Sequence, residues 1–197
     1  SANPDGGGFK LRAPQQRALE TYWYLRLQEK TPHILNLYKN LFPKKADLVV
    51  ALGIPDDAFK RADYDIDNLF ALTKEDDAFA KEFKLDALRE TFSLSYPSYI
   101  LALAMGAGKT ALIGAIYATE FAMAMEYPDG PFVQNALIFA PGLTIIQSLR
   151  ELLSLPYDRV LPPRLHKQFA ASVKMTFTKE GEKVIPVIAG SSFNVVV

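Results

Sequence analysis

The sequence predicts an α/β protein in which part of a parallel sheet carries a phosphate-binding loop, preceded by a mainly helical N-terminal region. An apolar run from Tyr99 to Ala104 leads into a glycine turn and then into an Ala-rich helical segment. A second apolar run, 135–140, is again followed by a helical pattern, whereas short helical patterns separated by turns occupy 31–95. Strands that alternate with helices are typical of a parallel sheet with right-handed crossovers.

The composition is ordinary for a soluble globular protein. Hydrophobic residues make up 49% of the chain and charged residues 22%, the formal net charge is zero, and there is no cysteine. A zero net charge gives no indication of nucleic-acid binding, although a local basic groove would be sufficient to bind DNA. No apolar run is long enough to cross a bilayer, and the first residues lack the features of a signal peptide. We therefore expect no membrane partner and a cytoplasmic location, which the absence of cysteine fits.

The N-terminal region predicts one amphipathic helix followed by several short ones. Residues 1–8 are turn-rich, and Pro14 suits the first turn of a helix over 15–30, in which Trp23 and its tyrosine neighbours are expected to pack into a core. Further helices are expected at 33–42, 45–52, 56–62, 67–72 and 74–92, from their apolar spacing and the turn residues between them.

The glycine turn after Ala104 has the composition of a phosphate-binding loop. Gly106 and Gly108 let the backbone approach an anion, and free N–H groups at the start of the following helix point toward it. Lys109 would neutralise β- and γ-phosphate charge, and the Thr110 hydroxyl would bind Mg²⁺. Leu103 stands where the full pattern has its first glycine, but the Gly-x-Gly-Lys-Thr ending is intact.

The elements after the loop complete the predicted sheet. They are a helix over 111–125, a buried strand over 135–140, a helix capped by Thr144 and running to Leu153, a hairpin formed by 173–178 and 183–189 outside the sheet, and a core strand at 193–197. Ligands of parallel sheets bind beyond the carboxyl ends of the strands, so 105–110 and 141–144 are expected at the same edge.

Three stretches resemble motifs of the superfamily 2 helicases and translocases. The stretch from Ile100 to Thr110 is similar to motif I, closest to the Res (motor) subunits of type III restriction enzymes. The stretch from Leu137 to Gln147 resembles motif Ia, with Gly142 in place of the usual Thr. The stretch from Leu11 to Leu19 resembles the Q-motif, with Pro14 where an aromatic residue is usual.

The resemblance implies a domain organisation and an activity. It implies an N-terminal extension with a Q-motif-like helix at 1–30, a helical insertion at 31–95, and the first part of a RecA-like ATPase lobe at 96–197. The parent protein would be an ATP hydrolase of the DNA-dependent helicase type, related to restriction enzymes. Its partners would be ATP, Mg²⁺, DNA and other restriction–modification subunits.

The resemblance also assigns individual site residues. The nucleotide would be held by Met105, Gly106, Ala107, Gly108, Lys109 and Thr110, with Lys109 and Thr110 as the catalytic residues and Thr110 as the metal ligand. Gln15 would bond the adenine edge, with Phe9 as a stacking partner. DNA phosphates would face Pro141, Gly142, Thr144 and Gln147.

Parts of a complete motor are not found in these 197 residues. No Asp-Glu pair follows an apolar strand downstream of Thr110, and the second lobe with its arginine finger is absent. The chain is therefore interpreted as an N-terminal fragment, truncated before motif II, that binds nucleotide weakly and does not turn it over.

Two alternatives remain open at this stage. A P-loop kinase of a small molecule or nucleoside would share the Gly-x-Gly-Lys-Thr loop, although such kinases usually keep the glycine that Leu103 replaces. Alternatively, residues 31–95 form a docking module for another subunit or for DNA, which the ATPase lobe merely carries.

Overall fold

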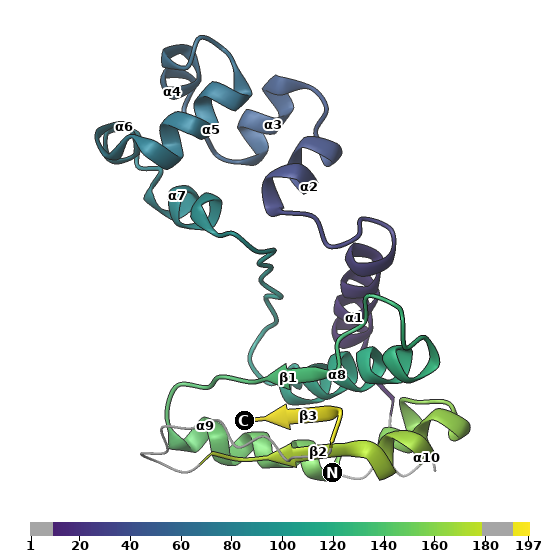
Figure 1. Cartoon of the computed structure of the whole chain (residues 1–197). Coiled ribbons are helices and arrows are strands. Elements are labelled where there is room, and N and C mark those ends of the chain that lie inside the picture. Colours follow the sequence, from purple (N-terminus) through teal and green to yellow (C-terminus); the bar gives the residue numbers. More distant parts are fainter. Residues whose placement is uncertain (1–9, 179–190) are drawn as a thin grey trace. The chain divides into compact units, whose positions relative to one another are not determined.

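The computed structural model describes residues 10–178 and 191–197 and divides the chain into two compact units. One unit combines 1–22 with 103–197 and contains the sheet, whereas the other, 23–102, is built from short helices (Figure 1). Among the described residues, none of the helices combines the length and the apolar character needed to cross a bilayer.

A three-stranded parallel sheet forms the centre of the first unit. It consists of β1 (Asn135–Leu137), β2 (Val173–Thr176) and β3 (Phe193–Val196), with β3 in the middle (Figure 1). Asn135 aligns with Asn194 and Val173 with Phe193. The predicted parallel sheet is therefore confirmed. The expectation that 173–178 lies outside the sheet is wrong, because β2 pairs in parallel with β3 at the edge of the sheet. The other arm of the predicted hairpin, 183–189, lies outside the described residues, so the hairpin itself stays a prediction.

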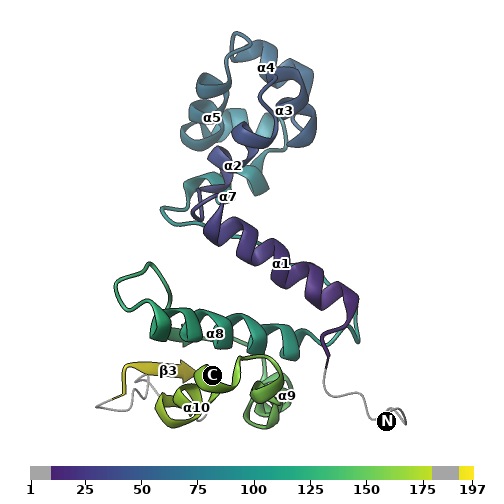
Figure 2. The same ribbon diagram turned by 90° about the vertical axis from the view of Figure 1, so that its right-hand side faces the viewer.

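Helices cover one face of this sheet. They are α8 (Lys109–Glu126), α9 (Leu143–Leu149), the 3₁₀ helices η1 (Arg150–Ser154) and η2 (Tyr157–Arg159), and α10 (Pro163–Ser172). Helix α8 runs along the sheet in both views (Figures 1 and 2). Its buried residues Tyr117, Ala118, Phe121 and Ala122 pack with Leu152, Leu165, Phe169, Val195 and Val197. Helix α10 was not predicted, although Pro163 in its first turn and the spacing of Leu165 and Phe169 are helical signals.

The second predicted strand, 135–140, is buried on one face only. Ala136 and Ile138 pack against the core, whereas Phe139 is 85% exposed and Leu137 is also exposed. The expectation of a buried strand is therefore only partly correct, because β1 lies at an edge of the sheet and only alternate residues of this run contact the core. The apolar run consequently alternates between core and exposed positions.

The first predicted strand, Tyr99–Ala104, does not form. These residues belong to no strand, and Ile100 is 92% exposed. A strand requires a neighbour for its backbone hydrogen bonds, and no described strand pairs with this segment. The prediction of a buried strand at 99–104 is therefore wrong, because apolar composition alone does not supply a pairing partner.

Helix α1 (Ala13–Leu27) confirms the helix expected near the N-terminus and ends before Lys30. Pro14 lies in its first turn, as predicted. The expected core packing of its aromatic residues is only partly correct. The side chains of Tyr22 and Trp23 are partly buried, whereas that of Tyr24 is exposed.

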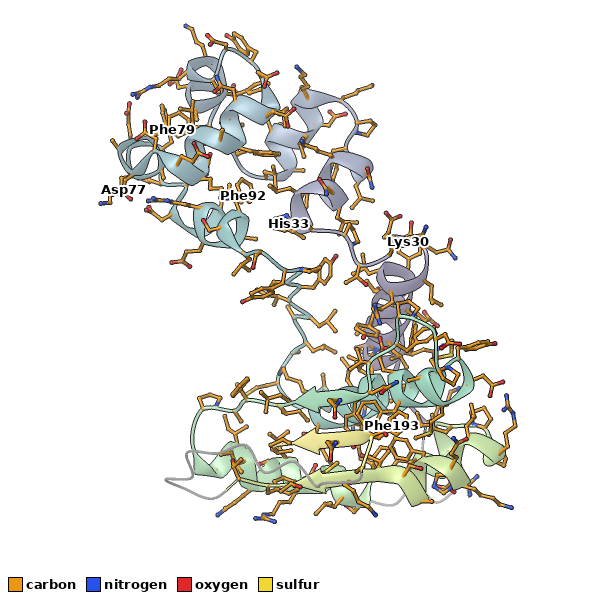
Figure 3. The ribbon with its side chains drawn as sticks, in the orientation of Figure 1. Lys30, His33, Asp77, Phe79, Phe92 and Phe193 are labelled. Atoms are coloured by element: carbon orange, nitrogen blue, oxygen red, sulfur yellow. The ribbon has the colours of Figure 1, made fainter. Side chains whose placement is uncertain are left out.

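Six short helices build the second unit. They are α2 (Ile34–Leu41), α3 (Lys45–Ala51), α4 (Asp56–Arg61), α5 (Ile66–Glu75), α6 (Asp77–Glu82) and α7 (Asp86–Ser93). They enclose their own core, which includes Leu48, Ile54, Leu69, Phe70, Phe79 and Phe92. Phe79 and Phe92 are buried members of this core (Figure 3). A unit with its own core can keep its fold independently of the sheet.

The helix expected over 74–92 is divided into two. Helix α5 extends to Glu75, and the Asp76 carboxylate then accepts a hydrogen bond from the Phe79 N–H and starts α6. At Lys84 the backbone turns into the left-handed region with φ 57°, which ends α6 before α7 begins. The apolar spacing is nearly continuous across this turn, so periodicity alone predicted one helix.

The stability of this helical unit at low pH should depend on Asp77. Hydrogen bonds from Lys81 and Arg89 lower the pKa of Asp77 from 3.8 to about 2. Its stabilising contribution is therefore present above the unfolded pKa and is lost as the pH falls from about 4 toward 2. We expect Asp77→Asn to lower the thermal midpoint at pH 6, and the difference from wild type to shrink as the pH approaches 2. Because the pair is exposed, 0.5 M NaCl should reduce the difference. A difference that persists unchanged at low pH contradicts this.

Candidate functional site

The predicted phosphate loop is a glycine turn at the start of α8. Gly106 and Gly108 have φ values of 75° and 76°, in the left-handed region that favours glycine. Gly108 is the N-cap residue of α8. The glycines thus lie in neither a strand nor the body of a helix, and the following backbone N–H groups begin an 18-residue helix.

The loop lies at the carboxyl edge of the sheet. In Figure 1, α8 begins on the side toward which the arrows of β1 and β3 point. Helix α8 runs away from this side, and the chain then returns toward it along β1 (Figure 1). This is the edge at which parallel sheets bind ligands.

Lys109 directs its ammonium group back over the loop. Its Nζ donates to the carbonyl oxygen of Ala104 at 3.2 Å, and the side chain is exposed. The N–H of Ala107 donates to the same oxygen, also at 3.2 Å. Met105 is fully exposed, and Thr110 is half-buried in the first turn of α8. A cation and a backbone N–H therefore converge on one carbonyl oxygen of the loop, and both are donors of the kind that can bind an anion.

Gln15 reaches this loop from the start of α1, 93 residues away in sequence. It is only 4% exposed, and its Nε2 donates to the Gly108 carbonyl at 2.8 Å, while its Oε1 accepts from the Arg12 N–H at 2.7 Å. A Gln side chain has a second amide hydrogen and a second lone pair. The bond to an adenine edge is compatible with these contacts and stays a prediction; Phe9 lies outside the described residues.

Arg12 is a loop contact that the sequence reasoning did not identify. Its Nη1 donates to the Gly106 carbonyl at 3.0 Å. In the described ranges 10–178 and 191–197, neither Arg12 nor Lys109 forms an ion pair. The only available signal was its position three residues before Gln15, which predicts no contact with a loop 94 residues away.

The four candidate DNA-contacting residues lie together after β1 and are exposed. They are Pro141, Gly142, Thr144 and Gln147, in the turn before α9 and on α9 itself. The prediction that Thr144 caps the helix is wrong. Gly142 is the N-cap residue, and Thr144 lies inside the first turn, where its carbonyl accepts from the Ser148 hydroxyl at 3.1 Å. The predicted extension to Leu153 is continued by η1 after α9 ends at Leu149.

The backbone at Gly142 has a conformation that favours glycine. Its φ is 86° and its ψ is 152°, a combination that is essentially restricted to glycine. A Thr at this position would require a different turn between β1 and α9. This turn therefore depends on a backbone conformation that glycine adopts without strain.

Glu120 is a second feature that the sequence reasoning missed. It lies in the middle of the apolar helix α8 and is only 2% exposed. Its carboxylate accepts from the Tyr22 hydroxyl of α1 at 2.5 Å and from the Val133 N–H at 3.0 Å. The Glu120 carboxylate thereby connects α8 to α1 and to the segment that leads into β1.

Comparison of the chain with protein-family models, with curated proteins and with solved structures found no match.

Proposed function

We propose that this chain binds ATP and Mg²⁺ through residues 105–110 and forms the first part of a RecA-like motor lobe of an ATP-dependent DNA helicase or translocase. The proposal rests mainly on one observation. Two left-handed glycines lead into α8 at the carboxyl edge of a parallel sheet, and the Lys109 ammonium and the Ala107 N–H converge on one oxygen of the loop. A triphosphate presents oxygens to such a site.

Each loop residue has a role in this proposal. Gly106 and Gly108 give the loop its shape, and the N–H groups of 105–110 cradle the phosphates. Lys109 neutralises phosphate charge, and the Thr110 hydroxyl is the side chain that would hold Mg²⁺. Gln15 bonds the adenine edge while it holds the loop through Gly108.

The DNA part of the proposal rests on the resemblance to motif Ia and on exposure. Thr144 and Gln147 are exposed beside the turn that contains Gly142, so their polar groups are accessible to a phosphate backbone. The parent protein would then be the motor of a restriction-type enzyme, working with DNA and with other restriction–modification subunits.

A second candidate function concerns the helical unit. Residues 31–95 contain nine Lys and Arg against twelve Asp and Glu, a net charge of −3, whereas the rest of the chain holds thirteen basic and ten acidic residues. A net negative unit repels DNA, so among the two docking partners considered, a protein subunit is favoured over DNA.

Binding of Mg²⁺–ATP to the ¹⁵N-labelled chain tests the proposed function. We expect backbone amide resonances of 105–110 to shift on titration, and Lys109→Ala to weaken binding roughly tenfold or more, because a charge-assisted contact to phosphate is lost. Lys167→Ala is a matched control, since Lys167 is an exposed lysine on α10. Equal binding by the two variants, or no shift at millimolar ATP, would refute nucleotide binding by this loop.

A further inference from the structure

The outer side of the phosphate loop is held by two side chains from the start of α1. Arg12 donates to the Gly106 carbonyl at 3.0 Å, and Gln15 donates to the Gly108 carbonyl at 2.8 Å. In a trans peptide the C=O and the next N–H point in opposite directions. Fixing these two carbonyls therefore directs the N–H groups of Ala107 and Lys109 toward the other side of the loop.

The inner side of the loop is occupied by its own backbone. The Ala104 carbonyl oxygen accepts both from the Ala107 N–H and from the Lys109 ammonium, each at 3.2 Å. Both distances are at the long end of the range for N–H···O bonds. A phosphate oxygen carries negative charge and would form shorter, stronger bonds with the same two donors.

We propose that Arg12 is a positioning residue of the phosphate loop, which holds the Gly106 carbonyl outward so that a phosphate oxygen can replace the Ala104 carbonyl on Ala107 and Lys109. This inference rests on the proposed function and deepens it. It adds a second cation to the site and names the backbone group that the ligand displaces.

The charge of Arg12 supports this role. Arg12 and Lys109 are both exposed, and within the part of the chain that the structure describes no carboxylate is paired with either of them. Of the five N–H donors of a guanidinium, one is used for Gly106, so others are available to an anion beside the loop. Arg12 also donates its own N–H to Gln15 and so positions both loop contacts.

Titration of the ¹⁵N-labelled chain with tripolyphosphate, with Mg²⁺–ATP and with adenosine tests this inference. We expect Arg12→Ala to weaken tripolyphosphate and ATP binding about tenfold and to reduce the ligand-induced shifts of the Ala107 and Lys109 amides. Adenosine, which has no phosphate, should bind as it does to wild type. Arg12→Lys should recover part of the loss, because it keeps the charge.

Arg17→Ala is the matched control. Arg17 is an exposed arginine on the next turn of α1, and within the ranges 10–178 and 191–197 its side chain forms no ion pair or hydrogen bond. Its loss should change tripolyphosphate affinity by less than about twofold. Equal affinities of the Arg12→Ala and Arg17→Ala variants would overturn the positioning role while leaving the proposed function intact. If wild type binds neither tripolyphosphate nor ATP, the proposed function fails as well. Arg12→Ala could weaken binding by destabilising the fold, which a lower thermal midpoint than that of Arg17→Ala would reveal. In that case the Arg12→Lys variant decides the question. Recovery of binding by Arg12→Lys supports the inference, and failure to recover binding overturns it.

Discussion

Replacing Gly108 with alanine is expected to weaken Mg²⁺–ATP binding roughly a hundredfold, to below detection for a weak site. A Cβ on Gly108 would lie 2.3 Å from Nε2 of Gln15, and φ at this position is 76°. The left-handed conformation costs a non-glycine residue about 1 kcal/mol or more. Moving the buried Gln15 amide away from the Gly108 carbonyl adds a lost hydrogen bond and an unsatisfied buried group, about 2 kcal/mol together. The sum corresponds to about two orders of magnitude in affinity.

Gly106→Ala separates the cost of the left-handed backbone from the cost of displacing the Gln15 side chain. Its φ of 75° is nearly the same, but no atom lies within 4 Å of an added Cβ. This variant should therefore show only the backbone effect, roughly a fivefold loss of affinity. Titration of both ¹⁵N-labelled variants with Mg²⁺–ATP gives the comparison. Equal losses in the two variants would mean that the contact between Gln15 and Gly108 does not support the loop.

Replacing Glu120 with alanine is expected to lower the free energy of unfolding of the sheet-containing unit by about 3 kcal/mol. The substitution leaves the Tyr22 hydroxyl and the Val133 N–H without their carboxylate acceptor. Because Glu120 is only 2% exposed, the site that it vacates is buried. Each hydrogen bond to a charged group is worth about 1.5–3 kcal/mol, and removal of the desolvation penalty of the carboxylate offsets part of the loss. Urea denaturation followed by circular dichroism measures the change.

Two further variants make the Glu120 prediction specific. Glu126→Ala removes the same residue type from the end of the same helix, where the carboxylate forms an ion pair with Arg164, and should have a smaller effect. In a double-mutant cycle, Tyr22→Phe should lose most of its effect in the Glu120→Ala background, because both substitutions remove the same bond. Additive effects of these two substitutions would contradict the proposed link between α1 and α8.

Much of the candidate site was predictable because its residues are contiguous. The glycine loop, Lys109 and Thr110 are recognised from spacing alone, and the structure places the glycines in the left-handed turn that this spacing requires. Gln15 was found only through the resemblance of its stretch to a known motif. Arg12 was missed because its contact with Gly106 depends on how the start of α1 meets a loop 94 residues away.

Elements outside the site show the same division between local and distant interactions. The positions of most short helices and the alternation of strand and helix after the loop were predictable, because caps, turns and periodicity act within a few residues. The sequence alone did not determine that 99–104 belongs to no strand, that β2 joins the sheet beside β3, or that α8 buries Glu120. Those outcomes depend on which segments supply backbone partners and which faces become covered, and only the tertiary structure decides both.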